Sequence, residues 1–231
     1  MFDLSPTEMT AILLSLRVAA VATLVATPLG IAAAWLLARR AFWGKPVVDA
    51  LIHLPLVLPP VVTGYLLLLS FGRRGLIGAW LADHLGIVFA FRWTGAALAC
   101  GIMAFPLLVR PIRLSIEAVD RRLEQAAATL GAPPWRVFAS VTLPLALPGV
   151  LAGMALGFAK AIGEFGATIT FVSNIPGETQ TISSAVYSLI QTPDGDAAAL
   201  RLVAVSIVIA MAALIASEFF ARRATRRLHG S

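Results

Sequence analysis

Long apolar runs separated by short clusters of charged residues dominate the chain. A helix that crosses the hydrocarbon core of a bilayer needs about 20 mostly apolar residues. The sequence contains five runs that meet this requirement or come close to it, at about 12–38, 50–71, 93–109, 149–172 and 202–221. This pattern predicts an all-α integral membrane protein in which residues 1–231 form a single transmembrane domain.

The second run and the segment after it depart from a plain spanning helix. Three prolines lie inside the second run: Pro55, Pro59 and Pro60. They should bend or break its helix, because proline lacks a backbone donor and clashes with the preceding turn. The next segment, Leu76 to Phe91, is apolar except for Asp83 and His84. As a helix it would be about 24 Å long, which is shorter than a hydrocarbon core of roughly 30 Å. We expect an interfacial or half-inserted helix here, with a sixth span as the alternative.

The composition also excludes a soluble protein. Hydrophobic residues make up 59% of the chain and charged residues 13%, against about 45–50% and about 25% in soluble domains. The formal net charge is +6. The basic residues lie in short clusters between apolar runs and form no contiguous basic stretch, so no nucleic-acid partner is expected.

The distribution of Lys and Arg predicts the orientation in the membrane. With five spans, three basic residues follow the first run, five follow the third and four follow the fifth, all on the same side. The opposite side receives four. Because cytoplasmic loops carry an excess of Lys and Arg, the N-terminus is expected outside and the C-terminus in the cytoplasm.

The longest cytoplasmic connection, between the third and fourth runs, carries a pattern of its own. Residues 121–130 are mostly strong helix formers and end at Gly131, a typical C-terminal cap. After Pro133 and Pro134, a second short helix is expected from Trp135 to Leu143. Two short helices at nearly right angles suit docking to a partner, and small residues such as Ala128 favour this over the alternative, a solvated connector.

The spacing within this connection resembles the EAA loop of ABC importer permeases. The residues that carry the resemblance are Gln125, Ala126, Ala127, Gly131, Val141, Leu143 and Pro144. Gln125 stands where that family usually has Glu, with Glu124 directly before it, and Val141 replaces Ile. Neither change alters helical or packing character. The resemblance therefore implies that residues 121–144 dock on a separate ATPase subunit as a coupling helix.

The resemblance also implies the partners and the location. They are two copies of the ATPase, a second copy of this chain and an external oxyanion-binding protein, assembled in a bacterial inner membrane. A P-loop requires GxxxxGK[ST], whereas Gly44-Lys45 is followed by Pro46. We therefore expect no enzymatic activity and no cofactor in this chain, with ATP and Mg²⁺ bound by the ATPase.

Two further segments narrow the resemblance. Residues 54–65 and 163–182 look like the corresponding segments of molybdate permease subunits. With the loop, the similarity covers nearly the whole chain and implies a type I importer permease that carries an oxyanion. Sulfate and tungstate permeases are close relatives, so these anions stay the alternatives to molybdate.

Several polar residues in or beside the spans are candidates for the translocation path. A tetrahedral dianion is best held by neutral donors and backbone N–H groups. The hydroxyls proposed for this are Thr63, Thr168 and Thr170, with Ser173 and Asn174 nearby. For each of them the alternative is a hydrogen bond to its own or a neighbouring helix. Lys160 and Glu164 share one helix face, where they either neutralise each other or line the path, with Lys160 offsetting substrate charge.

The remaining sequence features argue against a metalloprotein, a self-sufficient channel or secondary transporter, and an intramembrane enzyme. The single cysteine, Cys100, and the lone His53 predict no metal site. The small residues Gly149, Gly153 and Gly157 form one smooth helix face, suited to packing within the chain or to dimerisation. A self-sufficient anion channel or secondary transporter would usually carry inverted repeats, which we do not see. An intramembrane enzyme would need a polar cluster that only Lys160 with Glu164 approaches.

Overall fold

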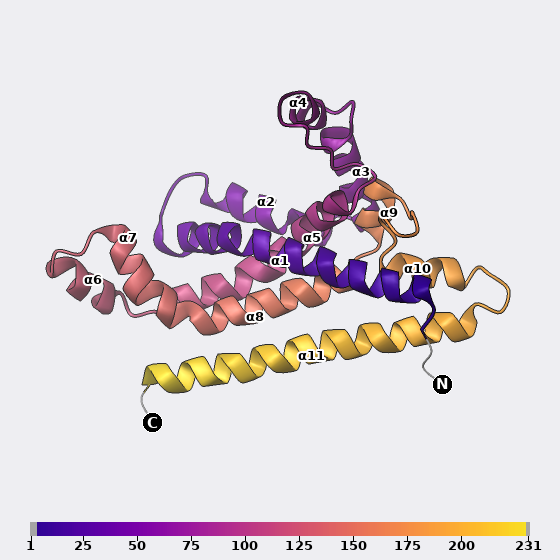
Figure 1. Cartoon of the computed structure of the whole chain (residues 1–231). Coiled ribbons are helices and arrows are strands. Elements are labelled where there is room, and N and C mark those ends of the chain that lie inside the picture. The colour runs from indigo at the N-terminus through magenta and orange to yellow at the C-terminus, as the bar shows by residue number, and fades with distance from the viewer. Residues whose placement is uncertain (1–3, 230–231) are drawn as a thin grey trace.

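The computed structural model describes residues 4–229, and every regular element in that range is helical. The elements are α1 (Pro6–Arg39), α2 (Lys45–Val57), α3 (Pro60–Phe71), α4 (Leu76–Leu85), α5 (Trp93–Ala118), α6 (Arg121–Thr129), α7 (Pro134–Val137), the π-helix η1 (Phe138–Thr142), α8 (Leu143–Ile162), α9 (Gly166–Val172), α10 (Ile182–Leu189) and α11 (Asp196–His229). Figure 1 shows an elongated bundle with α6 and α7 at one end and α9 and α10 at the other.

Helix α5 forms the centre of the bundle and packs against α1 and α8. Its side chains Cys100 and Leu108 are fully buried. The small residues of α8 allow the two backbones to approach closely. A Cβ added at Gly153 would lie 2.6 Å from the Leu108 carbonyl oxygen, and one at Gly149 would lie 2.6 Å from the Pro111 carbonyl oxygen. The glycine face of α8 is therefore used for packing within the chain, and the thiol of Cys100 is free and buried beside it.

The predicted membrane architecture is confirmed. Four helical segments are long and apolar enough to span a bilayer: Pro6–Arg39, Trp93–Ala118, Pro134–Ile162 and Asp196–Ala221. Helices α2 and α3 supply a fifth span if they are counted as one. Helix α4, at 10 residues, is only about 15 Å long. The described part of the chain holds no sixth candidate span, which favours the interfacial interpretation of this segment.

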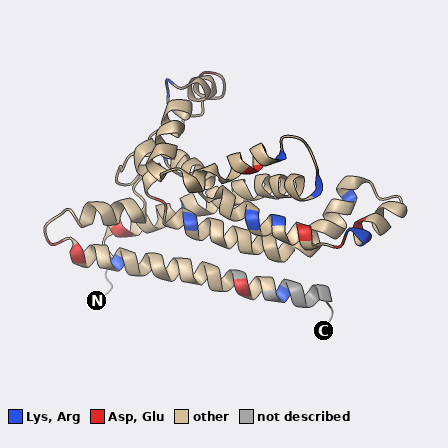
Figure 2. Cartoon of the chain, turned by 180° about the vertical axis from the view of Figure 1, so that it is seen from behind, with Lys and Arg blue, Asp and Glu red and all other residues tan. Residues whose placement is uncertain are grey.

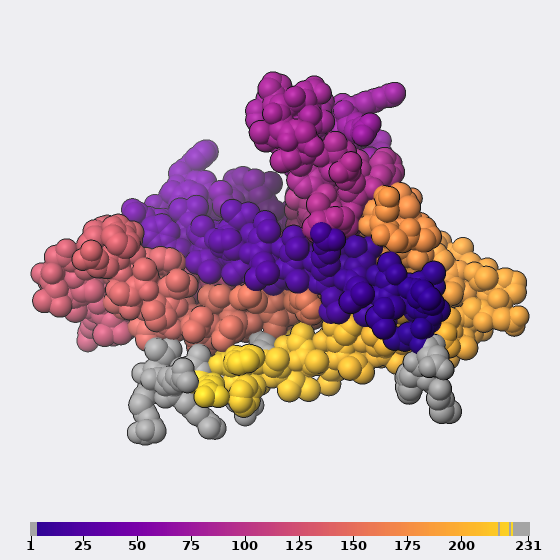
Figure 3. All heavy atoms as spheres, in the orientation of Figure 1, coloured from indigo at the N-terminus to yellow at the C-terminus, as the bar shows by residue number. Residues whose placement is uncertain are grey.

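The second span is broken at its adjacent prolines. Helices α2 and α3 meet at an angle of 114°, because Leu58 and Pro59 each precede a proline and both have extended backbone. Pro55 lies inside α2 without ending it. Figures 1 and 3 show that α3 and α4 project away from the bundle as a separate arm. At its base, α3 packs against α9.

The structure corrects the boundaries of the third and fourth spans. Helix α5 extends beyond residue 109 to Ala118. The prediction of a separate short helix at Trp135–Leu143 is wrong, because α7, η1 and α8 form one continuous segment to Ile162. The wider π-turn of η1 accommodates Pro144, whose ring would clash with the carbonyl four residues earlier in a regular α-helix. The same span ends at Ile162 and resumes as α9, so residues 149–172 are not one helix.

Charge is distributed unevenly along the bundle. Figure 2 shows Lys and Arg gathered toward the end that carries α6 and α7. An opposite-charge pair lies at the other end, where Arg201 of α11 contacts Glu8 of α1 at 2.9 Å. The side chains of Arg222, Arg226 and Arg227 lie outside the described residues. The described part of the basic clusters therefore marks the α6–α7 end as the cytoplasmic side.

Candidate docking loop and translocation residues

The loop between α5 and α8 contains the predicted short helix, α6. The Asp120 side chain caps its start by accepting a hydrogen bond from the backbone N–H of Arg122 at 2.9 Å. Gly131 follows its end with φ +84, a left-handed conformation that favours glycine. The backbone N–H of Ala132 then donates to the Ala127 carbonyl. The cap predicted at Gly131 is present, and it turns the chain back toward the bundle.

One face of α6 presents apolar side chains outward. Leu123, Ala126 and Leu130 lie at helical spacing on this face, which we call the docking face, and all three are exposed. Leu130 is 90% exposed, and the neighbouring Trp135 is 67% exposed. Adjacent large apolar side chains that are exposed at a charged end of a protein make a candidate interaction surface. The EAA-like motif does not include Leu123, Leu130 or Trp135. Only their exposure in the folded chain identifies them as surface candidates.

The remaining motif residues divide between the outer and inner sides of the loop. Gln125 is exposed, whereas Glu124 points inward and contacts Arg39 of α1 and Thr142 of η1. Ala127 is half-buried on the same inner side. Val141, Leu143 and Pro144 are half-buried where η1 passes into α8. The second half of the motif therefore shapes the start of a spanning helix, and the first half supplies the exposed surface.

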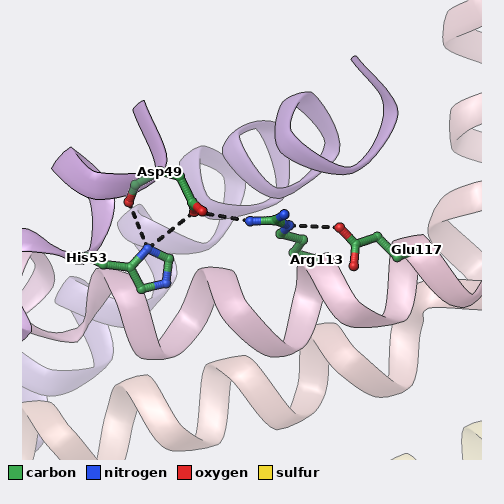
Figure 4. Close-up of polar contacts among 4 residues, drawn as sticks. All are labelled: Asp49, His53, Arg113 and Glu117. Atoms are coloured by element: carbon green, nitrogen blue, oxygen red, sulfur yellow. Dashed lines mark hydrogen bonds and ion pairs between the residues drawn. The ribbon is translucent and has the colours of Figure 1, made fainter. Parts of the chain in front are cut away.

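A second polar cluster ties α2 to α5 near the same end (Figure 4). Arg113 of α5 contacts Asp49 of α2 at 3.1 Å and Glu117 of α5 at 2.8 Å. The ring nitrogen Nδ1 of His53 lies 2.8 Å from the Asp49 carbonyl oxygen. His53 is therefore satisfied within its own helix, in keeping with a packing role. The contact between Asp49 and Arg113 joins residues 64 positions apart, so no local pattern could predict it.

Lys160 and Glu164 form an ion pair at the break between α8 and α9. Lys160 Nζ lies 2.6 Å from Glu164 Oε2. The other carboxylate oxygen, Oε1, accepts a hydrogen bond from the backbone N–H of Ala167 at 3.0 Å. The Glu164 side chain is 1% exposed and that of Lys160 is 28% exposed. Mutual neutralisation, one of the two predicted roles, is the arrangement present here, and Glu164 also joins the two halves of the broken span.

The candidate hydroxyls gather where α3 meets α9. A Cβ added at Gly64 would lie 2.5 Å from the Ala167 carbonyl oxygen and 2.9 Å from Thr170 Cβ, so these backbones nearly touch. The Thr168 and Thr170 hydroxyls donate to carbonyls of their own turn, at 2.9 Å and 2.8 Å. Thr63 Oγ1 is buried and has no hydrogen-bond partner among the described residues. Of the three threonines, only Thr63 keeps a hydroxyl without a bond to its own or a neighbouring helix.

Of the other two proposed donors, Asn174 is bonded elsewhere, and Ser173 is an exposed turn residue. The Asn174 side-chain amide donates to Ser188 Oγ of α10 at 2.7 Å. Ser173 has φ +67 and follows the last residue of α9. Asn174 and Ser173 thus shape the turn from α9 toward α10.

Comparison with known proteins identifies the class that this fold and loop define. Residues 26–226 match the family described as "Binding-protein-dependent transport system inner membrane component". The chain belongs to this family and is a multi-pass inner-membrane transport subunit.

Individual proteins that are similar to this chain indicate its place within the family. The chain is 59% identical over 224 residues to the molybdenum transport system permease protein ModB of Escherichia coli (strain K12), covering 97% of this chain and 98% of that protein. It is 56% identical over 221 residues to ModB of Haemophilus influenzae, covering 96% of each. Among solved structures, a bacterial alginate ABC transporter in complex with a pentasaccharide-bound periplasmic protein matches with a TM-score of 0.75 at 17% identity, over 96% of this chain and 81% of that one. That likeness shows the shared fold alone.

Proposed function

We propose that this chain is the membrane-spanning subunit of an ABC importer that carries molybdate into the cytoplasm. The observation that carries the proposal is the high identity to ModB permeases over almost the whole chain. In this proposal two copies line one path, and an external binding protein delivers the anion. ATP and Mg²⁺ are bound and hydrolysed by two copies of a separate ATPase, and this chain itself has no enzymatic activity.

The docking loop supports the assignment of transport to this chain and of ATP hydrolysis to a separate subunit. Its exposed apolar face lies at the basic end of the bundle, which the positive-inside rule places in the cytoplasm. With this end inside, α9 and α10 face outward, toward the binding protein. Closure of the ATPase dimer would draw the two docking loops together and turn the path outward.

The substrate is tested by the ATPase activity of the reconstituted complex. The binding protein is loaded with molybdate, tungstate or sulfate in turn and added to proteoliposomes. We expect strong stimulation by the molybdate-loaded protein and none by sulfate. Equal stimulation by sulfate would contradict the molybdate assignment, and uptake without ATP or partners would indicate a channel or secondary transporter.

The docking face is tested by Leu130→Glu. Leu130 is almost fully exposed in the single chain, so a charge there leaves folding and membrane insertion intact. At a covered interface it would be buried without a partner. A change at an interface hot spot costs about 2 kcal/mol or more, on the order of a 30-fold loss of affinity. We expect loss of ATPase subunit from the purified complex. The matched control is Ile190→Glu, since Ile190 is exposed in the polar turn after α10, at the opposite end of the bundle. Retention of the ATPase by Leu130→Glu would contradict the proposal.

A further inference from the structure

A single carboxylate joins the docking loop to two spanning helices. Glu124 Oε1 lies 3.2 Å from Arg39 Nε and 3.1 Å from Arg39 Nη2 at the end of α1. It also accepts the Thr142 hydroxyl of η1 at 2.6 Å. Arg39 Nη2 additionally donates to the Val119 carbonyl at 3.1 Å, directly before α6. We call Arg39, Glu124 and Thr142 the clamp.

The clamp is better shielded than the Arg113–Glu117 ion pair at the same end of the bundle. The Arg39 and Glu124 side chains are 9% and 18% exposed. In contrast, the Arg113 and Glu117 side chains are 25% and 38% exposed. Charge-assisted hydrogen bonds are stronger than neutral ones, and shielding from water strengthens them further. The clamp is therefore a firmer connection than the exposed pair.

Apart from the clamp, helix α6 makes few packing contacts with the rest of the bundle. None of its described residues is fully buried, and its packing is with α7 and η1. It makes no direct packing contact with α1 or α8 comparable to these. The carboxylate of Glu124 is thus the contact through which α6 reaches the end of α1, and the Thr142 hydroxyl extends it to the base of α8.

We propose that the clamp transmits displacement of the docking loop to α1 and α8, with Glu124 as the positioning residue. The inference rests on the proposed function, since it assumes that an ATPase moves α6. From Thr142 the continuous helix α8 runs 20 residues, about 30 Å, to the Lys160–Glu164 break. A shift at the loop therefore reaches the far end of the bundle as motion of a rigid helix. The exposed Gln125 on the same turn is left for the partner.

The test compares transport with ATP hydrolysis in proteoliposomes that contain the complete complex and molybdate-loaded binding protein. The variants are Glu124→Ala, Arg39→Met and Thr142→Val, with Glu117→Ala as the matched control for loss of a carboxylate. We expect each clamp variant to retain the ATPase subunit, because the docking face is unchanged. The number of anions imported per ATP should fall at least about fivefold for Glu124→Ala, less for Thr142→Val, and not at all for Glu117→Ala.

The charge swap Arg39→Glu with Glu124→Arg separates transmission from simple structural support. It restores the ion pair in reverse, so we expect anions imported per ATP to recover relative to either single change. An unchanged ratio in Glu124→Ala and Thr142→Val, with an active wild-type complex, overturns the clamp and leaves the proposed function standing. An absence of ATP-driven uptake in the wild-type complex overturns the proposed function itself. Should Glu124→Ala fail to assemble, Thr142→Val and the swap carry the same measurement.

Discussion

The chain contains two broken spans, and they are broken by different means. Between α2 and α3 the break follows from adjacent prolines, which force extended backbone and a bend of 114°. Between α8 and α9 it falls at Gly163–Phe165, where Glu164 bonds Lys160 on one side and the Ala167 N–H on the other. The first break is made by covalent geometry, and the second is held by a side chain. The second halves of both spans, α3 and α9, then pack together.

The largest effect is expected at the break that depends on a side chain. Lys160→Met leaves the carboxylate of Glu164 buried without its counter-charge, which should lower the free energy of unfolding by about 3–5 kcal/mol. Chemical unfolding of the chain in detergent measures this. The double variant Lys160→Met with Glu164→Gln should recover to within about 1 kcal/mol of the wild type, because no charge is left unpaired.

The same double variant separates the two predicted roles of the pair. Normal uptake with recovered stability means that Lys160 serves to neutralise Glu164. Loss of uptake despite recovered stability would instead assign Lys160 to the translocation path. A double variant as unstable as the single one would contradict the ion-pair account.

A smaller effect is expected where the two second halves meet. Gly64→Ala places a Cβ within 2.5 Å of the Ala167 carbonyl oxygen, and a backbone atom cannot move aside as a side chain can. Overpacking of this kind costs about 1–3 kcal/mol. The matched control is Gly163→Ala, where an added Cβ would lie 3.9 Å from the Ala159 carbonyl oxygen, an ordinary contact distance. Equal stability of the two variants would show that α3 and α9 do not need this close approach.

The smallest effect is expected at the proline break. Pro60→Ala removes the restriction on Pro59, but Pro59 still restricts Leu58 to extended backbone and so keeps the bend. The unfolding free energy should change by less than about 1 kcal/mol, mainly through the greater freedom of the unfolded chain. A loss as large as that of Gly64→Ala would mean that Pro59 alone does not maintain the angle between α2 and α3.

The break between α2 and α3 was predictable from the sequence, and the break between α8 and α9 was not. Pro59 and Pro60 act on their own neighbours, so a bend in the second span was predictable from local geometry. Gly163 and Phe165 carry no comparable local signal, and the span at 149–172 reads as continuous. The same limit applies to the short helix that was expected to end at Leu143. Pro144, the next residue, lies in a continuous helix because the π-turn of η1 makes room for it.

In the candidate site, too, local features were predictable from the sequence and contacts between distant residues were not. The spacing of Gln125, Gly131 and Leu143 located the docking loop, because short helices and caps are local features. It did not show that Glu124 faces Arg39, which is 85 residues away in the chain. For Thr168 and Thr170, the sequence left a choice between free donors and bonds within the helix, and in the structure both hydroxyls donate to carbonyls of their own turn.

By itself, the sequence predicted the membrane class, a count of about five spans, the orientation and the position of the loop that carries the docking motif. Each of these follows from apolar run length, charge placement or short-range spacing, which depend on near neighbours and on the solvent. The tertiary structure decided which polar groups are paired, where the fourth span breaks and how α6 is fastened to α1 and α8. Those outcomes depend on contacts between distant segments, and such contacts exist only once the helices have packed.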